Sequence, residues 1–166
     1  MDVHEAIRTK RAIRNFADQP VPDDAIRAVL NAGRRAQSSK NTQPWVFIAI
    51  RDRDSLKKLS ECGKYAGHLA GAAFAVAIVS PSADTDFDLG QAAAYMQLAA
   101  WELGIGSCIA YLHKQEKAKA VLGLPPEMHF HTAISFGYPA PEQRRPEVVR
   151  KGGRRPFEEV VRWERW

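Results

Sequence analysis

Four short apolar segments, separated by segments with helical periodicity, most constrain how this chain can fold. A run such as Trp-Val-Phe-Ile-Ala-Ile, which follows a polar loop, is typical of a buried strand. Strands are predicted at residues 45–50, 72–79, 106–112 and 130–136. Helices are predicted at residues 3–7, 22–33, 52–62, 87–103 and 114–122. Strands mixed with helices indicate a layered α+β or α/β domain, and the residues alone leave the strand order open.

The longest predicted helix, residues 87–103, is apolar on most of its faces. Its central sequence is QAAAYMQLAAWEL, and Gly104 ends it. A helix of this kind is buried either in a core or in a subunit interface. We therefore expect this helix to lie at the centre of the molecule.

The character of the chain changes after residue 136. The segment 137–156 is rich in Pro, Gly and Arg and has little to bury, which predicts an extended arm. Apolar residues return in the last ten positions, which include Trp163 and the final residue Trp166. The 166 residues fit one domain, with a core at 1–136 and an arm at 137–166. We expect the arm to dock on a partner subunit; the alternative is that it folds back on its own core.

The formal net charge is +5, and the surplus lies near the two termini and at Arg34 and Arg35. A nucleic-acid module is one interpretation of this surplus, and a local phosphate site inside a pocket is another. The N-terminus has no apolar signal segment, and the apolar run at 69–79 is too short to span a bilayer. The last two features predict a cytoplasmic protein that binds no membrane. No recognised nucleic-acid-binding motif occurs, so we expect no nucleic-acid partner.

Motifs for protein-based catalysis or metal binding are absent from the sequence. Cys62 and Cys108 show no metal-ligand spacing, and Cys108 is expected to be a buried structural thiol. His129 and His131 share a strand face without a third ligand, so we expect no metal. There is no GxSxG, GxGxxG, P-loop or HExxH pattern. The sequence therefore predicts no catalytic side chain.

Two basic clusters and one polar loop are the candidate binding elements. Lys10, Arg11 and Arg14 stand in a stretch without acids, and a second cluster spans residues 151–155. Guanidinium groups bind phosphate bidentately, although each cluster alone could be a solvated turn or a flexible tail. The loop 38–45, SSKNTQPW, suits a flat heterocycle, or it simply caps nearby helix ends.

The order of these elements resembles the nitroreductase family over essentially the whole chain. The resemblance rests on KRAIRNFADQPV, QSSKNTQPW, GIGSC, LGLP, FGYP and RRPFEEVV. It implies an α+β fold with a central, mostly antiparallel sheet flanked by helices, an intertwined homodimer and a bound FMN. It also implies that NADH or NADPH donates electrons, which pass by a ping-pong mechanism to a conjugated acceptor such as a nitroaromatic or a quinone. A flavin-binding or redox-sensing protein without turnover is the alternative.

The resemblance also implies which residues bind FMN. The basic box would hold the phosphate and the ribityl chain, the polar loop would reach the flavin from the other subunit, and the strand after GIGSC would pass beside the ring. The late arginines would return to the phosphate. A further contact would fall near Tyr65 or His68, which the motifs do not distinguish. The predicted set is Lys10, Arg11, Ala12, Arg14, Gln37, Ser38, Ser39, Asn41, Ile109, Ala110, Tyr111, Arg154 and Arg155.

Two features depart from the family pattern. Ala12 stands where family members usually carry Ser, which removes one side-chain hydrogen bond to the phosphate. The chain also has only residues 52–80 where larger members insert an excursion that shapes the substrate pocket. The physiological acceptor is therefore not predicted by the sequence.

Overall fold

The computed structural model describes residues 1–143 and 153–166. Its centre is a four-stranded sheet in the order β1-β2-β4-β3, and every pair of neighbouring strands is antiparallel. The strands are β1 (Val46–Ile50), β2 (Phe74–Ser80), β3 (Gly106–Tyr111) and β4 (His129–Gly137). The predicted α+β class and antiparallel sheet are therefore confirmed, and all four strands lie within two residues of the expected positions.

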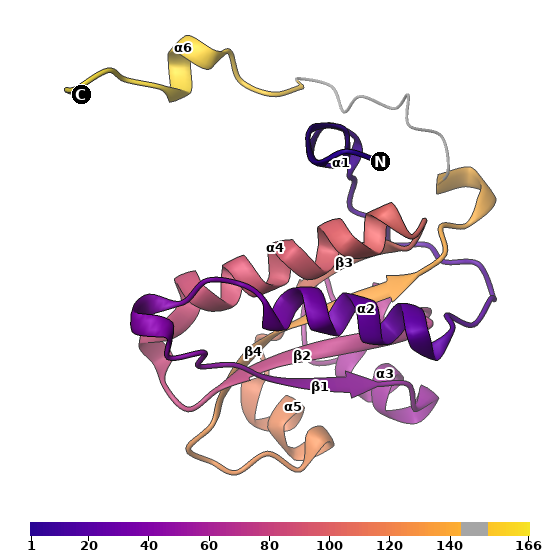
Figure 1. Ribbon diagram of the computed structural model, residues 1–166. Coiled ribbons are helices and arrows are strands. Elements are labelled where there is room, and N and C mark those ends of the chain that lie inside the picture. The colour runs from indigo at the N-terminus through magenta and orange to yellow at the C-terminus, as the bar shows by residue number, and fades with distance from the viewer. Residues whose placement is uncertain (144–152) are drawn as a thin grey trace.

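Helices cover both faces of the sheet (Figure 1). On one face lie α2 (Asp23–Arg34) and α4 (Asp86–Glu102), which pack so closely that a Cβ at Gly33 would stand 2.7 Å from Met96 Cγ. On the other face lie α3 (Arg53–Ser60) and α5 (Gln115–Leu122). The N-terminal α1 (Val3–Thr9) rests on α4 through a hydrogen bond from Trp101 Nε1 to Thr9 Oγ1. All five expected helices are present.

All residues of β2 are buried, and their side chains alternate between the two faces of the sheet. Each face therefore carries its own apolar core. Phe74, Phe136 and Met96 lie in the core under α2 and α4, while Leu59 and Phe130 lie in the core under α3 and α5. The rings of Phe74 and Phe136 stack with their centroids 4.8 Å apart. Burial of large apolar side chains on both faces stabilises the layered arrangement.

The basic segment after α1 runs along the outer edge of β3. Ala12 pairs with Ser107 in a parallel bridge, and Ile13 N donates to Ser107 O at 3.0 Å. Further along, Ala17 N donates to Tyr138 O, and Ala140 N donates to Asn15 O. These bonds hold residues 12–17 against the sheet and tie residues 138–140 to the core.

Close packing of Ile13 on Gly106 sets the position of this segment. A Cβ at Gly106 would stand 2.6 Å from Ile13 Cβ, closer than real Cβ contacts allow. We expect Gly106→Ala to lower the free energy of unfolding by about 1–3 kcal/mol, because overpacking forces the backbone apart. Gly90→Ala is the matched control, since nothing lies within 4 Å of its Cβ and Ala is the better helix former. Urea unfolding of both variants measures the difference; equal stability of Gly106→Ala and the unchanged protein contradicts the prediction.

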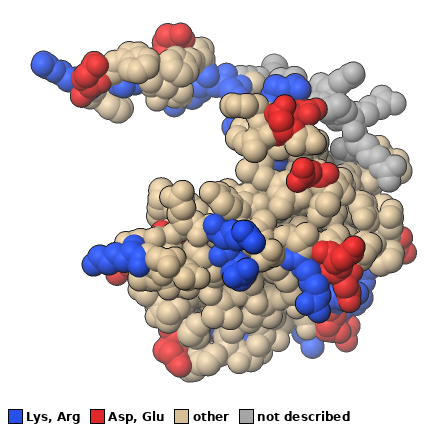
Figure 2. Space-filling view, in the orientation of Figure 1, with Lys and Arg blue, Asp and Glu red and all other residues tan. Residues whose placement is uncertain are grey.

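The described end of the arm stands clear of the globular body. It contains one short helix, α6 (Phe157–Val160), which the sequence did not predict. Trp163 and Trp166 are 74% and 105% exposed, and Phe157 and Val160 are also exposed. Figure 2 shows this segment projecting from the body, with basic and acidic side chains interspersed along it. Within the described residues, the tryptophans therefore do not cap the core of their own chain.

Candidate functional site

Lys10 is held beside the β3 edge by a polar side chain of α4. Its Nζ donates to Gln97 Oε1 at 3.3 Å, and Gln97 Nε2 donates to Ser107 Oγ at 3.1 Å. Gln97 and Ser107 are both buried. A buried amide with both ends bonded has a fixed orientation, so the ammonium group of Lys10 is positioned rather than loosely solvated.

A second cation lies close to Lys10. Burial lowers the pKa of Lys10 from its ordinary value; the Cys108 thiol opposes this shift, and the Arg154 guanidinium adds to it. Like charges brought together and partly desolvated favour a bound anion, because an anion removes both penalties. Lys10 and Arg154, 144 positions apart in the chain, are therefore candidates for binding an anion.

The other residues of the two basic clusters have different partners. Arg11 Nη1 donates to the carbonyl oxygens of Arg8 and Lys10 at 2.8 and 2.9 Å, so its guanidinium closes the end of α1. Ala12 contributes the backbone pairing with Ser107. Arg155 binds Glu159 one helical turn away. Lys151 and Gly152, the first residues of the second cluster, lie outside the described residues.

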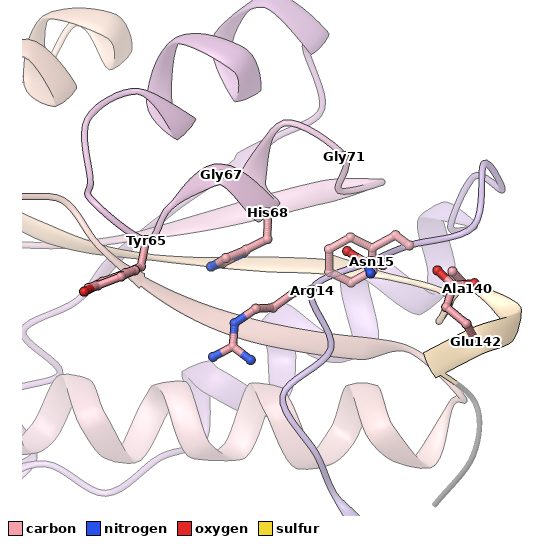
Figure 3. Close-up of a pocket in the computed structure, with 9 residues that line it drawn as sticks. Arg14, Asn15, Tyr65, Gly67, His68, Gly71, Ala140 and Glu142 are labelled. Carbon is pink, nitrogen blue, oxygen red and sulfur yellow. The ribbon is translucent and has the colours of Figure 1, made fainter. Parts of the chain in front are cut away.

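Arg14 lines an open pocket of about 560 Å³ on the side of β3 and β4 that faces the short turn η2 (Gly67–Leu69). The pocket is also lined by Asn15, Phe16, Tyr65, His68 and Glu142. Figure 3 shows the imidazole of His68 directed toward Tyr65, with the guanidinium of Arg14 lying below it in this view. Arg14 and His68 therefore line the same pocket.

His68 is the one buried titratable side chain of this pocket. Its Nδ1 lies 2.7 Å from Ser135 Oγ, and Ser135 Oγ donates to Cys108 O at 3.2 Å. Its Nε2 is buried and has no hydrogen-bond partner among the described residues. Burial lowers the pKa of His68, Arg14 lowers it further, and the backbone of Ile109 opposes both effects. The imidazole is therefore neutral at pH 7.

This shift in the pKa of His68 predicts a pH dependence of stability. In the unfolded chain His68 titrates near 6.5, and in the folded protein it takes up a proton only at lower pH. Below about pH 6.5 the unfolded state binds more protons, so the free energy of unfolding falls until the pH passes the folded pKa. We expect the free energy of unfolding of His68→Gln to fall less than that of the unchanged protein between pH 7.5 and 5. Urea unfolding of the FMN-free protein tests it; parallel pH profiles for the two proteins contradict it.

The polar loop forms a strained turn at the far end of α4. The 3₁₀ turn η1 (Ser39–Asn41) is followed by Thr42, and Lys40, Asn41 and Gln43 all have positive φ. Ser38 Oγ accepts from Gln43 N, Ser39 N donates to Asp88, and Gln91 Nε2 donates to Gln37 O. Non-glycine residues with positive φ cost free energy and concentrate at functional sites. The hydroxyl of Ser38 thus bonds within the loop, and it makes no capping hydrogen bond to η1.

Within one chain this loop does not meet the basic segment. The loop binds α4 at Asp88 and Lys10 binds it at Gln97, nine residues away, which is about 13 Å along a helix. The loop and Lys10 therefore lie along different turns of α4. The sharing of the site by two subunits stays a prediction.

The three predicted residues of β3 differ in exposure. Ile109 and Tyr111 are about half exposed beside α4, whereas Ala110 points into the core under α3 and α5 and offers a ligand only its backbone. The ring of Tyr111 contacts His113 and His131, and His131 Nε2 lies 3.0 Å from Asp86 Oδ1. Ile109 and Tyr111 therefore provide an exposed apolar wall at the edge strand.

Sequence reasoning missed Gln97, Ser107 and Ser135 as part of this site. The signal for Gln97 was a polar residue in the middle of an apolar helix. Over residues 1–143 and 153–166, no three His, Cys, Asp or Glu side chains are grouped as a metal site, and both cysteines are buried thiols. None of the helices in that part of the chain combines the length and apolar character needed to cross a bilayer.

The model of the nitroreductase family matches residues 7–62 and 60–138. A protein of Archaeoglobus fulgidus named "Putative NADH dehydrogenase/NAD(P)H nitroreductase" is 34% identical over 148 residues, which cover 82% of this chain and 85% of that protein.

Solved structures agree with this match. The "FMN-dependent Nitroreductase" of Clostridium difficile R20291 is 25% identical, with a TM-score of 0.83 over 99% of this chain and 100% of the other. A Desulfovibrio desulfuricans protein described as "a putative nitroreductase in complex with fmn" is 29% identical, with a TM-score of 0.82 over 100% and 98% of the two chains. The chain belongs to the nitroreductase family.

Proposed function

We propose that the protein is an FMN-dependent oxidoreductase that passes electrons from NADH or NADPH to a conjugated acceptor such as a nitroaromatic or a quinone. The observation that carries the proposal is the Lys10 ammonium group, held beside β3 through buried Gln97 and Ser107, together with a pocket lined by Arg14 and His68. A dianionic phosphate suits the cations beside β3, and a flat polar ring suits the pocket. Relatives named for FMN and NAD(P)H support this reading.

Different residues would bind different parts of the cofactor. Lys10 and Arg154 would hold the phosphate by charge-assisted hydrogen bonds, and Gln97 would keep Lys10 in place. Arg14 and His68 would contact the ring, which moves Arg14 from the phosphate role that the sequence suggested. Ile109 and Tyr111 would line the ring from β3. Ala12 offers no side-chain donor, so the phosphate would depend more strongly on the two cations.

Bound FMN would supply hydride and electron transfer, and the protein would supply position, electrostatics and access. The sequence carries no catalytic-triad motif, so the chemistry is assigned to the cofactor. Ile109 and Tyr111 would border the ring, and a planar donor and then a planar acceptor would stack in turn on the face of the ring that is left open. Alternating use of one face would suit a ping-pong mechanism.

The proposed enzyme is a homodimer. The exposed apolar side chains of α1, α4, β3 and α6 are a larger set than a monomer normally leaves in water; they include Val3, Ile7, Phe87, Tyr95, Ile109, Tyr111, Phe157, Trp163 and Trp166. A second copy would bring residues 37–41 of its loop, namely Gln37, Ser38, Ser39 and Asn41, toward the ring. The second copy would also cover the exposed apolar side chains of the arm.

The test is the purified protein itself. We expect a yellow protein that releases FMN on heating, oxidises NADH or NADPH, and transfers the electrons to a quinone or nitroaromatic. Release of FAD, or failure to bind added FMN, would overturn the proposal. Bound FMN without oxidation of either nicotinamide would favour the alternative of a flavin-binding or redox-sensing protein.

A further inference from the structure

Two exposed aromatic side chains lie on neighbouring segments at one end of the pocket. Tyr65 lines the pocket and is 75% exposed, and Tyr111 of β3 is 51% exposed. The two segments are in direct contact, because a Cβ at Gly63 would collide with Tyr111 O. Residues 63–65 and 111–114 therefore form one continuous surface, which we call the tyrosine rim.

The tyrosine rim carries two cations that no acid neutralises. Lys64 Nζ lies 5.4 Å from the centroid of the Tyr65 ring, and Lys114 is exposed on the other segment. In the part of the chain that the structure describes, neither ammonium group has a carboxylate within ion-pair distance. The neighbouring acid Glu61 is bound by Lys117 at 2.9 Å. A surface with unneutralised cations attracts anions.

His113 adds a third hydrogen-bond donor to the rim. The backbone N–H of Lys64 donates to His113 Nδ1 at 3.3 Å, so in the neutral ring the proton is on Nε2. His113 is exposed, and its ring packs edge-on against Tyr111 with the centroids 5.1 Å apart. The acid that lines the pocket, Glu142, lies at the end opposite Tyr65 (Figure 3). An anionic ligand would therefore direct its charge to the rim.

We propose that the tyrosine rim selects electron acceptors that carry a carboxylate or another anionic group on a planar ring. The acceptor ring would lie against Tyr65 or Tyr111, and its anion would bind Lys64, Lys114 and the Nε2–H of His113. The inference rests on the proposed function, which places the flavin beside Tyr111 and in the pocket that Tyr65 lines. It adds the charge of the acceptor to that proposal.

The test compares 4-nitrobenzoate with 4-nitrobenzamide, which have nearly the same shape and differ in charge at neutral pH. The amide withdraws electrons more strongly than the carboxylate, so intrinsic ease of reduction favours the uncharged compound. The ratio kcat/KM is measured for both acceptors with the FMN-loaded protein. The proteins are the unchanged chain, Lys64→Gln, the double variant Lys64→Gln with Lys114→Gln, and the control Arg27→Gln, which removes one charge from exposed Arg27 of α2.

We expect kcat/KM of the unchanged protein and of Arg27→Gln to be about threefold to twentyfold higher for 4-nitrobenzoate, because each exposed ion pair contributes up to about fivefold. The preference should fall in Lys64→Gln and disappear in the double variant. Added salt should reduce it, since ions screen exposed charges. Binding of 4-chlorobenzoate and 4-chlorobenzamide, followed through the flavin absorbance, should show the same order without turnover.

Three results would overturn the inference. Equal or lower kcat/KM for 4-nitrobenzoate in the unchanged protein would show that the rim does not select an anion, while the turnover itself would support the proposed function. A preference that persists in the double variant would place the selecting charge elsewhere. Equal use of the two acceptors, with a loss in the double variant that is confined to NADPH, would assign the rim to the 2′-phosphate of the donor. Failure to reduce any nitroaromatic or quinone would overturn the proposed function together with this inference.

Discussion

A chain that ends at Glu142 is expected to fold as a monomer that no longer retains FMN. The truncation keeps Pro139 and Ala140, which pair with residues 15–16, so the core remains intact. It removes Arg154 from beside Lys10 and removes the exposed apolar residues of the arm. Burial of one large apolar side chain is worth about 1.5–3 kcal/mol, so loss of the arm should abolish dimerisation at micromolar concentration. Sedimentation and the flavin absorbance of both proteins measure the result.

A matched variant separates the two contributions of the arm. The double change Trp163→Ser and Trp166→Ser keeps Arg154 and should weaken the dimer more than it weakens phosphate binding in the dimer that remains. Urea unfolding of the FMN-free truncated chain checks that the core is still folded. A full-length protein that sediments as a flavin-loaded monomer would show that the arm has another purpose.

Lys10→Met is expected to weaken FMN binding about tenfold to hundredfold. One hydrogen bond to a charged group contributes about 1.5–3 kcal/mol, and each 1.4 kcal/mol is about a factor of ten in affinity. Riboflavin lacks the phosphate, so its affinity should change much less. Fluorescence titration with both flavins isolates the phosphate contribution of Lys10.

Arg11→Met is the control for this experiment. Arg11 stands next to Lys10 and carries the same charge, but its guanidinium binds carbonyl oxygens at the end of α1. We expect it to affect FMN affinity far less than Lys10→Met does. Arg154→Met should resemble Lys10→Met, and the double variant should be non-additive because both cations hold one group. Equal losses from Lys10→Met and Arg11→Met would contradict the assignment.

Local patterns predicted the secondary structure well. The acids at Asp23 and Asp24 do lie in the first turn of α2, and Gly123 ends α5 with a left-handed φ of 64°. These features depend on residues that are close in the chain, and the sequence shows them directly. The resemblance also predicted a phosphate-binding box near residue 10, and this stays a prediction.

Other parts of the site were not predicted because they depend on long-range contacts. Gln97 joins Lys10 to Ser107 from the middle of an apolar helix, and Ser135 contacts His68 from a strand 67 residues away. Pairing of β4 with both β2 and β3 places Ser135 opposite Ala75 and Cys108. No periodicity of a short segment contains that information.

By itself, the sequence determined the helices, the strands and the family of the protein, since burial periodicity and capping are local properties of the chain. Only the tertiary structure decided how the basic residues are divided. It left Arg11 at the end of α1, brought Lys10 to Gln97 on α4, and placed Arg14 in one pocket with His68. The physical reason is that a side chain's hydrogen-bonding role is set by the neighbours that packing brings to it. The neighbours of Arg11 are local, whereas Gln97 lies 87 positions from Lys10 and His68 lies 54 positions from Arg14.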